Sequence, residues 1–202
     1  MAVVEYAPDR EADVDGDGPT VLLWHGSGPN DRQGLTALAR AVSARGHRTV
    51  TPDWDSTAAD VGRADLLTSL RFARETCGHD PDLVTLVGWS RGGIAVASLT
   101  LNQRRLGIGI ARAVCVAAAP FPRTDPISGV VLGPATPPVD RDTTVAFVNG
   151  SRDELTPIDD VRATHQQWNE AGWPTTLDLL DADHFTLVEE HAEAVADIVM
   201  QR

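Results

Sequence analysis

Six short apolar runs rich in β-branched residues recur from residue 20 onward, separated by longer segments of helical hydrophobic period. The runs predict β-strands at 20–24, 48–52, 83–88, 111–118, 144–149 and 175–180. The segments between and after them predict helices at 31–45, 60–76, 91–103, 157–171 and 186–201. Strands that alternate with helices indicate a doubly wound α/β protein, with a mostly parallel sheet and helices on both of its faces.

Most of the predicted strands are almost entirely apolar, as expected when helices cover both faces of a sheet. Residues 3–6 predict an additional edge strand. The chain has 202 residues, which is enough for one well-buried domain and short for two, so we expect a single domain over 1–202. The one long irregular segment, 120–141, would border the mouth of a site at the carboxyl ends of the strands.

The composition is that of an ordinary folded protein, with 42% hydrophobic and 23% charged residues. The formal net charge is -12, and all 17 basic residues are arginines. A surface of this charge should repel nucleic acid and anionic membranes, so we expect neither as a partner. The net charge favours a neutral or cationic small-molecule substrate over an anionic one.

The N-terminal stretch lacks the features of a signal peptide and no apolar run reaches the length of a membrane span, so we expect a cytoplasmic protein. Cys77 and Cys115 match no disulfide or metal motif, and Cys115 is predicted to lie in the core. The acidic segment from Asp13 to Gly18 imitates the start of a calcium loop, but Trp24 occupies the position of the bidentate glutamate. We interpret the segment as an acidic turn and expect no metal or other cofactor.

The most informative motif is GWSRG at 88–92, in which Ser90 stands between a predicted strand and a predicted helix. A tight strand-to-helix turn brings backbone segments together, so the positions of Gly88 and Gly92 have no room for side chains. Such a turn lifts the Ser90 hydroxyl clear of the sheet, at a helix N-terminus where backbone N–H groups favour a developing negative charge. The alternative is a glycine-rich turn with a helix-capping serine.

This arrangement of strand, G-x-S-x-G and helix resembles the α/β-hydrolase superfamily, and the resemblance covers nearly the whole chain from about residue 20 onward. It implies a minimal α/β-hydrolase fold without a cap domain, similar to small lidless serine carboxylesterases and thioesterases. In this superfamily an acid and then a histidine follow the nucleophile along the chain. The resemblance therefore implies a catalytic triad with Ser90 as its nucleophile.

Asp153 is the expected acid. It lies in the sequence GSRDELTP after a predicted strand, which resembles the acid loop G-x-x-D-x-x-x-P of the superfamily. Glu154 is the runner-up, and Asp178, Asp181 and Asp183 belong to the next strand and its loop. The alternative role for Asp153 is that of a turn-forming or helix-capping aspartate.

His184 is the expected base, because it lies on the loop after the strand at 175–180. A catalytic histidine accepts the serine proton and later returns it to the leaving group, which requires a loop beside the serine turn. The other histidines fit less well, because they precede the serine or fall inside predicted helices: His25, His47, His79, His165 and His191.

The sequence HGSG at 25–28 follows a predicted strand. By resemblance it is the oxyanion loop, and the two donors are the backbone N–H groups of Ser27 and Arg91. A plain glycine-rich loop is the alternative. We expect Trp89, Phe121 and Phe185, together with Ser27, to wall the substrate pocket, which without a cap should be shallow and open.

Together these features favour a serine hydrolase that cleaves a carboxylic ester through an acyl-enzyme on Ser90, with His184 as the base and Asp153 as the orienting acid. Two alternatives remain open. One is an acyl thioesterase with the same triad, and the other is a member of the fold that binds a ligand with slow turnover or none.

Overall fold

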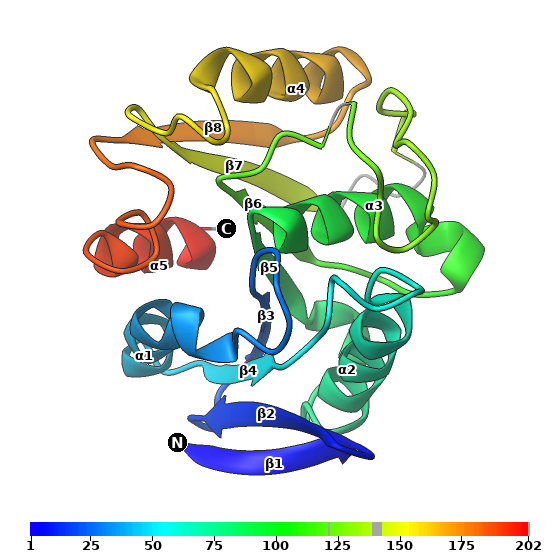
Figure 1. The fold of residues 1–202 in the computed structure, drawn as a ribbon, viewed down its shortest axis with the longest axis vertical. Coiled ribbons are helices and arrows are strands. Elements are labelled where there is room, and N and C mark those ends of the chain that lie inside the picture. The colour runs from blue at the N-terminus through cyan, green and yellow to red at the C-terminus, as the bar shows by residue number, and fades with distance from the viewer. Residues whose placement is uncertain (121, 139–142, 202) are drawn as a thin grey trace.

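The computed structural model describes residues 1–120, 122–138 and 143–201. The strands within these ranges are β1 (Ala2–Ala7), β2 (Arg10–Asp15), β3 (Thr20–Trp24), β4 (Arg48–Pro52), β5 (Thr85–Trp89), β6 (Arg112–Val116), β7 (Thr144–Gly150) and β8 (Thr175–Leu180). The α-helices are α1 (Thr36–Ala44), α2 (Arg63–Glu75), α3 (Arg91–Leu106), α4 (Ile158–Glu170) and α5 (Ala192–Met200) (Figure 1). Two short 3-10 helices, Arg32–Leu35 and Pro81–Leu83, precede α1 and β5.

All of these strands belong to one sheet in the order β1-β2-β4-β3-β5-β6-β7-β8. From β4 to β8 neighbouring strands are parallel, whereas β2 is antiparallel to both β1 and β4. The chain passes from β3 to β4 on one side and then crosses to β5 on the other side of β3. The loops that leave β3 and β5 therefore diverge, and a crevice at such a switch point is the usual place for a ligand.

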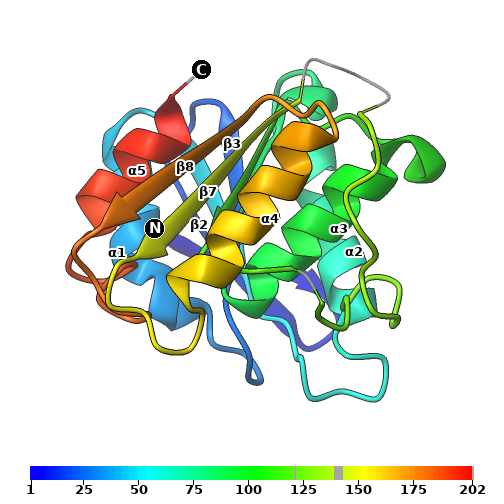
Figure 2. The same ribbon diagram turned by 90° about the horizontal axis from the view of Figure 1, so that it is seen from above.

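Helices cover both faces of the sheet, with α1 and α5 on one face and α2, α3 and α4 on the other (Figure 2). The side chains of β3 show why the strand is apolar throughout. Val21 and Leu23 pack under α1 and α5, whereas Leu22 and Trp24 pack under α2 and α3, because successive side chains of a strand point to opposite faces. The predicted α/β class, with its mostly parallel sheet, is confirmed.

Most element bounds differ from the prediction by a few residues, and two differences are informative. The predicted acidic turn is wrong at its start, because Asp13 and Asp15 lie in β2, where Ala12 and Val14 alternate with them. We missed this strand because its short apolar side chains are interrupted by acids. The last helix begins at Ala192 instead of residue 186, since the preceding residues form turns. Between β6 and β7 the described residues form no helix, which agrees with the expected absence of a cap.

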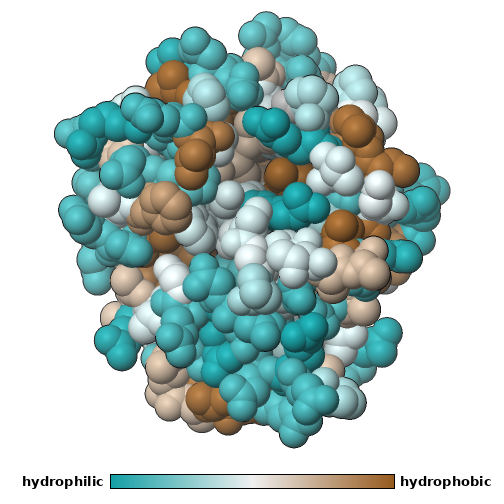
Figure 3. Space-filling view, viewed as in Figure 1, coloured by the Kyte–Doolittle hydropathy of each residue, from teal (hydrophilic) through white to brown (hydrophobic). Residues whose placement is uncertain are grey.

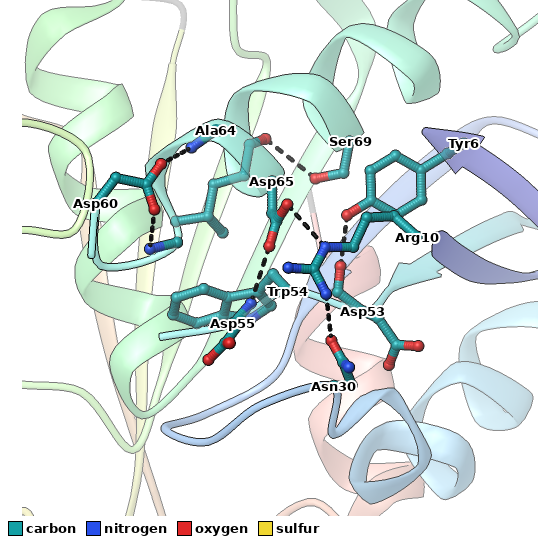
Figure 4. A network of polar contacts seen from close by, with 12 residues as sticks. Tyr6, Arg10, Asn30, Asp53, Trp54, Asp55, Asp60, Ala64, Asp65 and Ser69 are labelled. Carbon is teal, nitrogen blue, oxygen red and sulfur yellow. Dashed lines mark hydrogen bonds and ion pairs between the residues drawn. The ribbon is translucent and has the colours of Figure 1, made fainter. Parts of the chain in front are cut away.

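A polar network joins the β1–β2 hairpin to the centre of the protein (Figure 4). The Tyr6 hydroxyl donates to the carbonyl of Asp53 at 2.5 Å, and burial raises the pKa of this phenol. The Arg10 guanidinium donates to Asp65 of α2 and to the side chain of Asn30, both at 2.9 Å. Because Asn30 lies on the loop after β3, the network also holds the far end of the loop that begins with His25.

Both cysteines are free and buried. Burial raises the pKa of the Cys115 thiol to about 12, so this group stays protonated and serves as part of the core. Within 1–120, 122–138 and 143–201, no helix has both the length and the apolar character that crossing a bilayer requires.

Candidate active site

Ser90 lies on a strained turn between β5 and α3. Its backbone has a φ of 54° and a ψ of −118°, a combination that a non-glycine residue adopts at a cost of about 1–3 kcal/mol. A Cβ atom added at Gly88 would lie 2.2 Å from the Gly92 carbonyl oxygen, and one at Gly92 would lie 2.4 Å from the Trp24 oxygen. Both glycines are therefore required by close backbone contact, as the sequence motif predicted.

Backbone hydrogen bonds hold this turn in place. The Ser90 N–H donates to the Val116 carbonyl at 2.8 Å, which ties the turn to the end of β6. The Ser90 carbonyl accepts from the N–H groups of Gly93 and Ile94, the first bonds of α3. The serine side chain is thus placed at the N-terminus of a long helix, where the positive end of the helix dipole favours an anion.

His25 organises the loop after β3. The Nε2 atom of its buried ring accepts from the N–H groups of Asp31 at 3.2 Å and Trp54 at 3.3 Å, which requires the neutral ring with its proton on Nδ1. Nδ1 then donates to the Gly26 carbonyl at 3.0 Å. Burial lowers the pKa of His25. His25 is the first residue of the HGSG motif, which predicted no role for its side chain, and the structure shows that it shapes the loop.

Ser27 and Arg91, the two expected oxyanion donors, line the same hollow as Ser90. A Cβ atom added at Gly26 would lie 3.2 Å from the Ser90 Cβ, so the loop after β3 packs directly beside the serine. Among the described residues, neither the Ser27 nor the Arg91 backbone N–H donates a hydrogen bond. Two such N–H groups beside one hydroxyl can stabilise negative charge that develops there.

Asp153 and His184 form a buried pair. The His184 Nδ1 lies 2.8 Å from the Asp153 Oδ2, and the Asp153 side chain is fully buried. The other carboxylate oxygen of Asp153 accepts from the N–H groups of Leu155 at 2.9 Å and Thr156 at 2.8 Å. Because a carboxylate only accepts hydrogen bonds, the His184 proton sits on Nδ1 and the lone pair on Nε2.

The other acids that the sequence left open lie in different contacts. Glu154 is exposed at the rim of the His184 hollow. Asp178 lies in β8, and one of its carboxylate oxygens is buried without a hydrogen-bond partner. Asp181 forms an ion pair with Arg152 at 2.9 Å. Asp183 accepts hydrogen bonds from the N–H groups of its own turn. Of these acids, Asp153 is the one in contact with His184.

Trp89 connects the serine turn to the histidine loop. Its indole Nε1–H donates to the His184 carbonyl at 3.0 Å, and its ring centroid lies 5.3 Å from that of His184. Trp89 is only 6% exposed and supports the site from behind instead of walling it. Among the described residues, the hydrogen bonds of His184 are those to Trp89 and Asp153, and none joins it to Ser90.

Two hollows meet at Leu155, on the face that Figure 3 shows hollowed near its centre. One, of about 300 Å³, contains Ser90, Ser27 and Arg91. The other, of about 450 Å³, contains His184 and the expected pocket residue Phe185, which is 53% exposed. The remaining expected pocket residue, Phe121, lies outside the described residues.

Two residues that the sequence did not single out, Thr156 and Arg123, also line the Ser90 hollow. Thr156 precedes the proline of the acid loop, and its hydroxyl donates to the Ala117 carbonyl at 3.0 Å, which ties that loop to the end of β6. Arg123 lies in the irregular segment after β6, where the sequence carried no signal beyond the proximity of that segment to the site. In the part of the chain that the structure describes, no three His, Cys, Asp or Glu side chains form a potential metal site.

Lowering the pH through the titration range of His25 is expected to destabilise the fold. Because the pKa of His25 is lower in the folded state than its ordinary value of 6.5, the unfolded chain binds the proton first. The contribution of the neutral His25 ring to the free energy of unfolding is therefore complete above about pH 7.5 and is lost as the pH falls below about 6.5. Urea unfolding at several pH values measures this change in the free energy of unfolding.

The variant His25→Gln should flatten this pH dependence, while His47→Gln, at a partly exposed histidine, should keep the wild-type slope. If His25→Gln and the wild type lose stability equally steeply between about pH 7 and 5, the assigned role of His25 is wrong.

The parallel sheet, its switch point and the strand–serine–helix turn give this chain the α/β-hydrolase fold. Solved structures that it is similar to include a serine hydrolase homologue from Coxiella burnetii, with 19% identity and a TM-score of 0.69 over 98% of this chain and 94% of that one. Esterase 2 of Thermogutta terrifontis shares 14% identity with a TM-score of 0.73 over 98% and 90%. The α/β-hydrolase enzyme MGS-M1 from a deep-sea metagenome shares 14% with a TM-score of 0.73 over 98% and 93%. No family model and no curated protein matches the chain.

Proposed function

We propose that this protein is a serine hydrolase that cleaves a carboxylic ester through an acyl-enzyme on Ser90. The main support is the buried pair of His184 and Asp153 beside a serine on a strained turn. Similar solved structures include an arylesterase and forms of the Thermogutta terrifontis esterase with propionate or butyrate bound. The proposed substrate is a small-molecule acyl ester.

In the proposed mechanism, the Ser90 oxygen attacks the ester carbonyl carbon while Nε2 of His184 takes the hydroxyl proton. Asp153 holds the ring with Nδ1 protonated and stabilises the imidazolium that forms. The oxyanion of the tetrahedral intermediate accepts from the backbone N–H groups of Ser27 and Arg91.

The intermediate then collapses: the bond from carbon to the leaving oxygen breaks, and His184 gives its proton to the departing alcohol. In the second half, water attacks the acyl carbon and gives a proton to His184. The bond to the Ser90 oxygen breaks, the carboxylic acid product leaves, and the proton returns from His184 to Ser90. No step consumes a cofactor.

Of the expected pocket residues, Phe185 is the one that we propose to contact the substrate. Together with Leu155, which is 62% exposed, it offers an apolar surface at the mouth between the two hollows. Exposed large apolar side chains beside a polar site are typical of binding surfaces.

A fluorophosphonate probe tests the proposed function, because it phosphonylates only a serine activated by its base. The wild type should be labelled, and Ser90→Ala should not. Ser151→Ala, at an exposed serine two residues before Asp153, is the matched control and should be labelled like the wild type. Folded wild-type protein that stays unlabelled would instead favour a ligand-binding member of the fold.

A further inference from the structure

The hollow beside Ser90 has a local charge opposite to that of the whole chain. Two of the side chains that line it are arginines, Arg91 and Arg123, and none is an aspartate or a glutamate. The rest of the lining is apolar or carries hydroxyl groups, as with Ile94 and Thr156. In a chain with a formal net charge of -12, this is a local positive site next to the proposed nucleophile.

Neither arginine is neutralised within the described residues. The Nε atom of Arg91 is buried without a hydrogen-bond partner, and the side chain of Arg123 takes part in no hydrogen bond or ion pair there. Arginines elsewhere behave differently: Arg32 and Arg45, for example, each contact at least two carboxylates. An unpaired buried guanidinium nitrogen is costly, and an anionic ligand group in the hollow would offset that cost by pairing with the guanidinium.

The neighbouring hollow around His184 differs in charge. It contains Glu154 and Asp183, and its one arginine, Arg152, is already paired with Asp181 at 2.9 Å. Its apolar surface comes from Leu155 and Phe185. The two sides of the site therefore suit different parts of one substrate: an anionic part beside Ser90 and Arg91, and an uncharged or cationic apolar part beside Phe185.

Resting on the proposed function, we propose that the substrate is an ester with a carboxylate on the part that enters the Ser90 hollow, where Arg91 and Arg123 bind it. Guanidinium groups pair with carboxylates through two parallel N–H···O bonds, which gives orientation as well as affinity. The volume of about 300 Å³ is at the small end of ligand sites, so the charged part is short. This substrate differs from the neutral or cationic one that the net charge favoured.

The experiment compares two phenyl esters of nearly equal shape, the monophenyl ester of adipic acid and phenyl adipamate, in which a neutral amide replaces the carboxylate. The wild type should have a kcat/KM at least about ten-fold higher for the anionic ester, and the ratio should fall at high salt. Arg91→Met and Arg123→Met should each lower this ratio about ten-fold, while keeping the apolar stem of the side chain.

Arg104→Met is the matched control, because it removes the same charge from the exposed far end of α3. It should keep the wild-type ratio. The inference is overturned if the wild type has a kcat/KM for the anionic ester no higher than that for the amide. If phenyl adipamate is still cleaved in a Ser90-dependent way, the proposed function stands. If Arg91→Met does not fold, Arg123→Met tests the inference by itself, because replacing the exposed Arg123 side chain should not disturb folding.

Binding to Ser90→Ala gives a readout that is independent of turnover. Calorimetry should find that this variant binds the anionic ester at least about ten-fold more tightly than the amide, and that adding Arg123→Met removes the difference. Equal affinities overturn the inference. If the anionic ester binds preferentially and the wild type cleaves neither ester, the anion site stands and the proposed function fails.

Discussion

Replacing Ser90 with alanine is expected to lower kcat for p-nitrophenyl acetate by about a million-fold. The hydroxyl is the proposed nucleophile, so its removal leaves only the binding and oxyanion contributions. His184→Ala should have a similar effect, and the double variant should be little worse than either single one, because the two side chains act as one unit. Steady-state kinetics at saturating ester measure each rate.

The fold should survive these substitutions, which allows a clean comparison. The Ser90 hydroxyl makes no hydrogen bond to another described side chain, and alanine keeps the same Cβ in the strained turn. Ser151→Ala and His47→Ala are the matched controls and should retain wild-type rates. Additive losses in the double variant would show that Ser90 and His184 act in separate processes, which contradicts the proposed triad.

Asp153→Asn is expected to lower kcat by about ten-thousand-fold. The asparagine oxygen can still accept from the Leu155 and Thr156 N–H groups, which leaves its NH₂ group facing the ring of His184. Nδ1 must then carry the lone pair, and the proton moves to Nε2, where it blocks removal of the Ser90 proton. The loss therefore comes from the wrong tautomer in an intact structure.

Glu154→Gln is the matched control, since it makes the same chemical change one residue further on, at an exposed side chain. It should keep a rate close to that of the wild type. A rate for Asp153→Asn within a few-fold of the wild type would reject Asp153 as the acid. A large loss in Glu154→Gln would instead point to the runner-up.

The fold was predictable from the sequence where local pattern and tertiary environment agree. The bounds of β3, β4 and β8 were predicted correctly, because short runs of β-branched and apolar residues are bounded by turn residues. β2 was missed because its only inward-facing apolar side chains are Ala12 and Val14, while Glu11 and Asp13 pair with Arg32 of a later segment. Such long-range ion pairs leave no periodic signal in the chain.

For the site, the sequence by itself determined the serine turn, because Gly88, Ser90 and Gly92 are consecutive parts of one local structure and need close backbone contact wherever they occur. It also placed candidate acids and a histidine after that turn. The family resemblance singled out Asp153 among the acids, but only the tertiary structure showed its contact with His184, which joins two loops 31 residues apart. The same holds for Arg91 and Arg123, which line one hollow from different elements. The register of parallel strands decides which loops meet at the carboxyl edge of the sheet, and that register depends on the packing of the whole core.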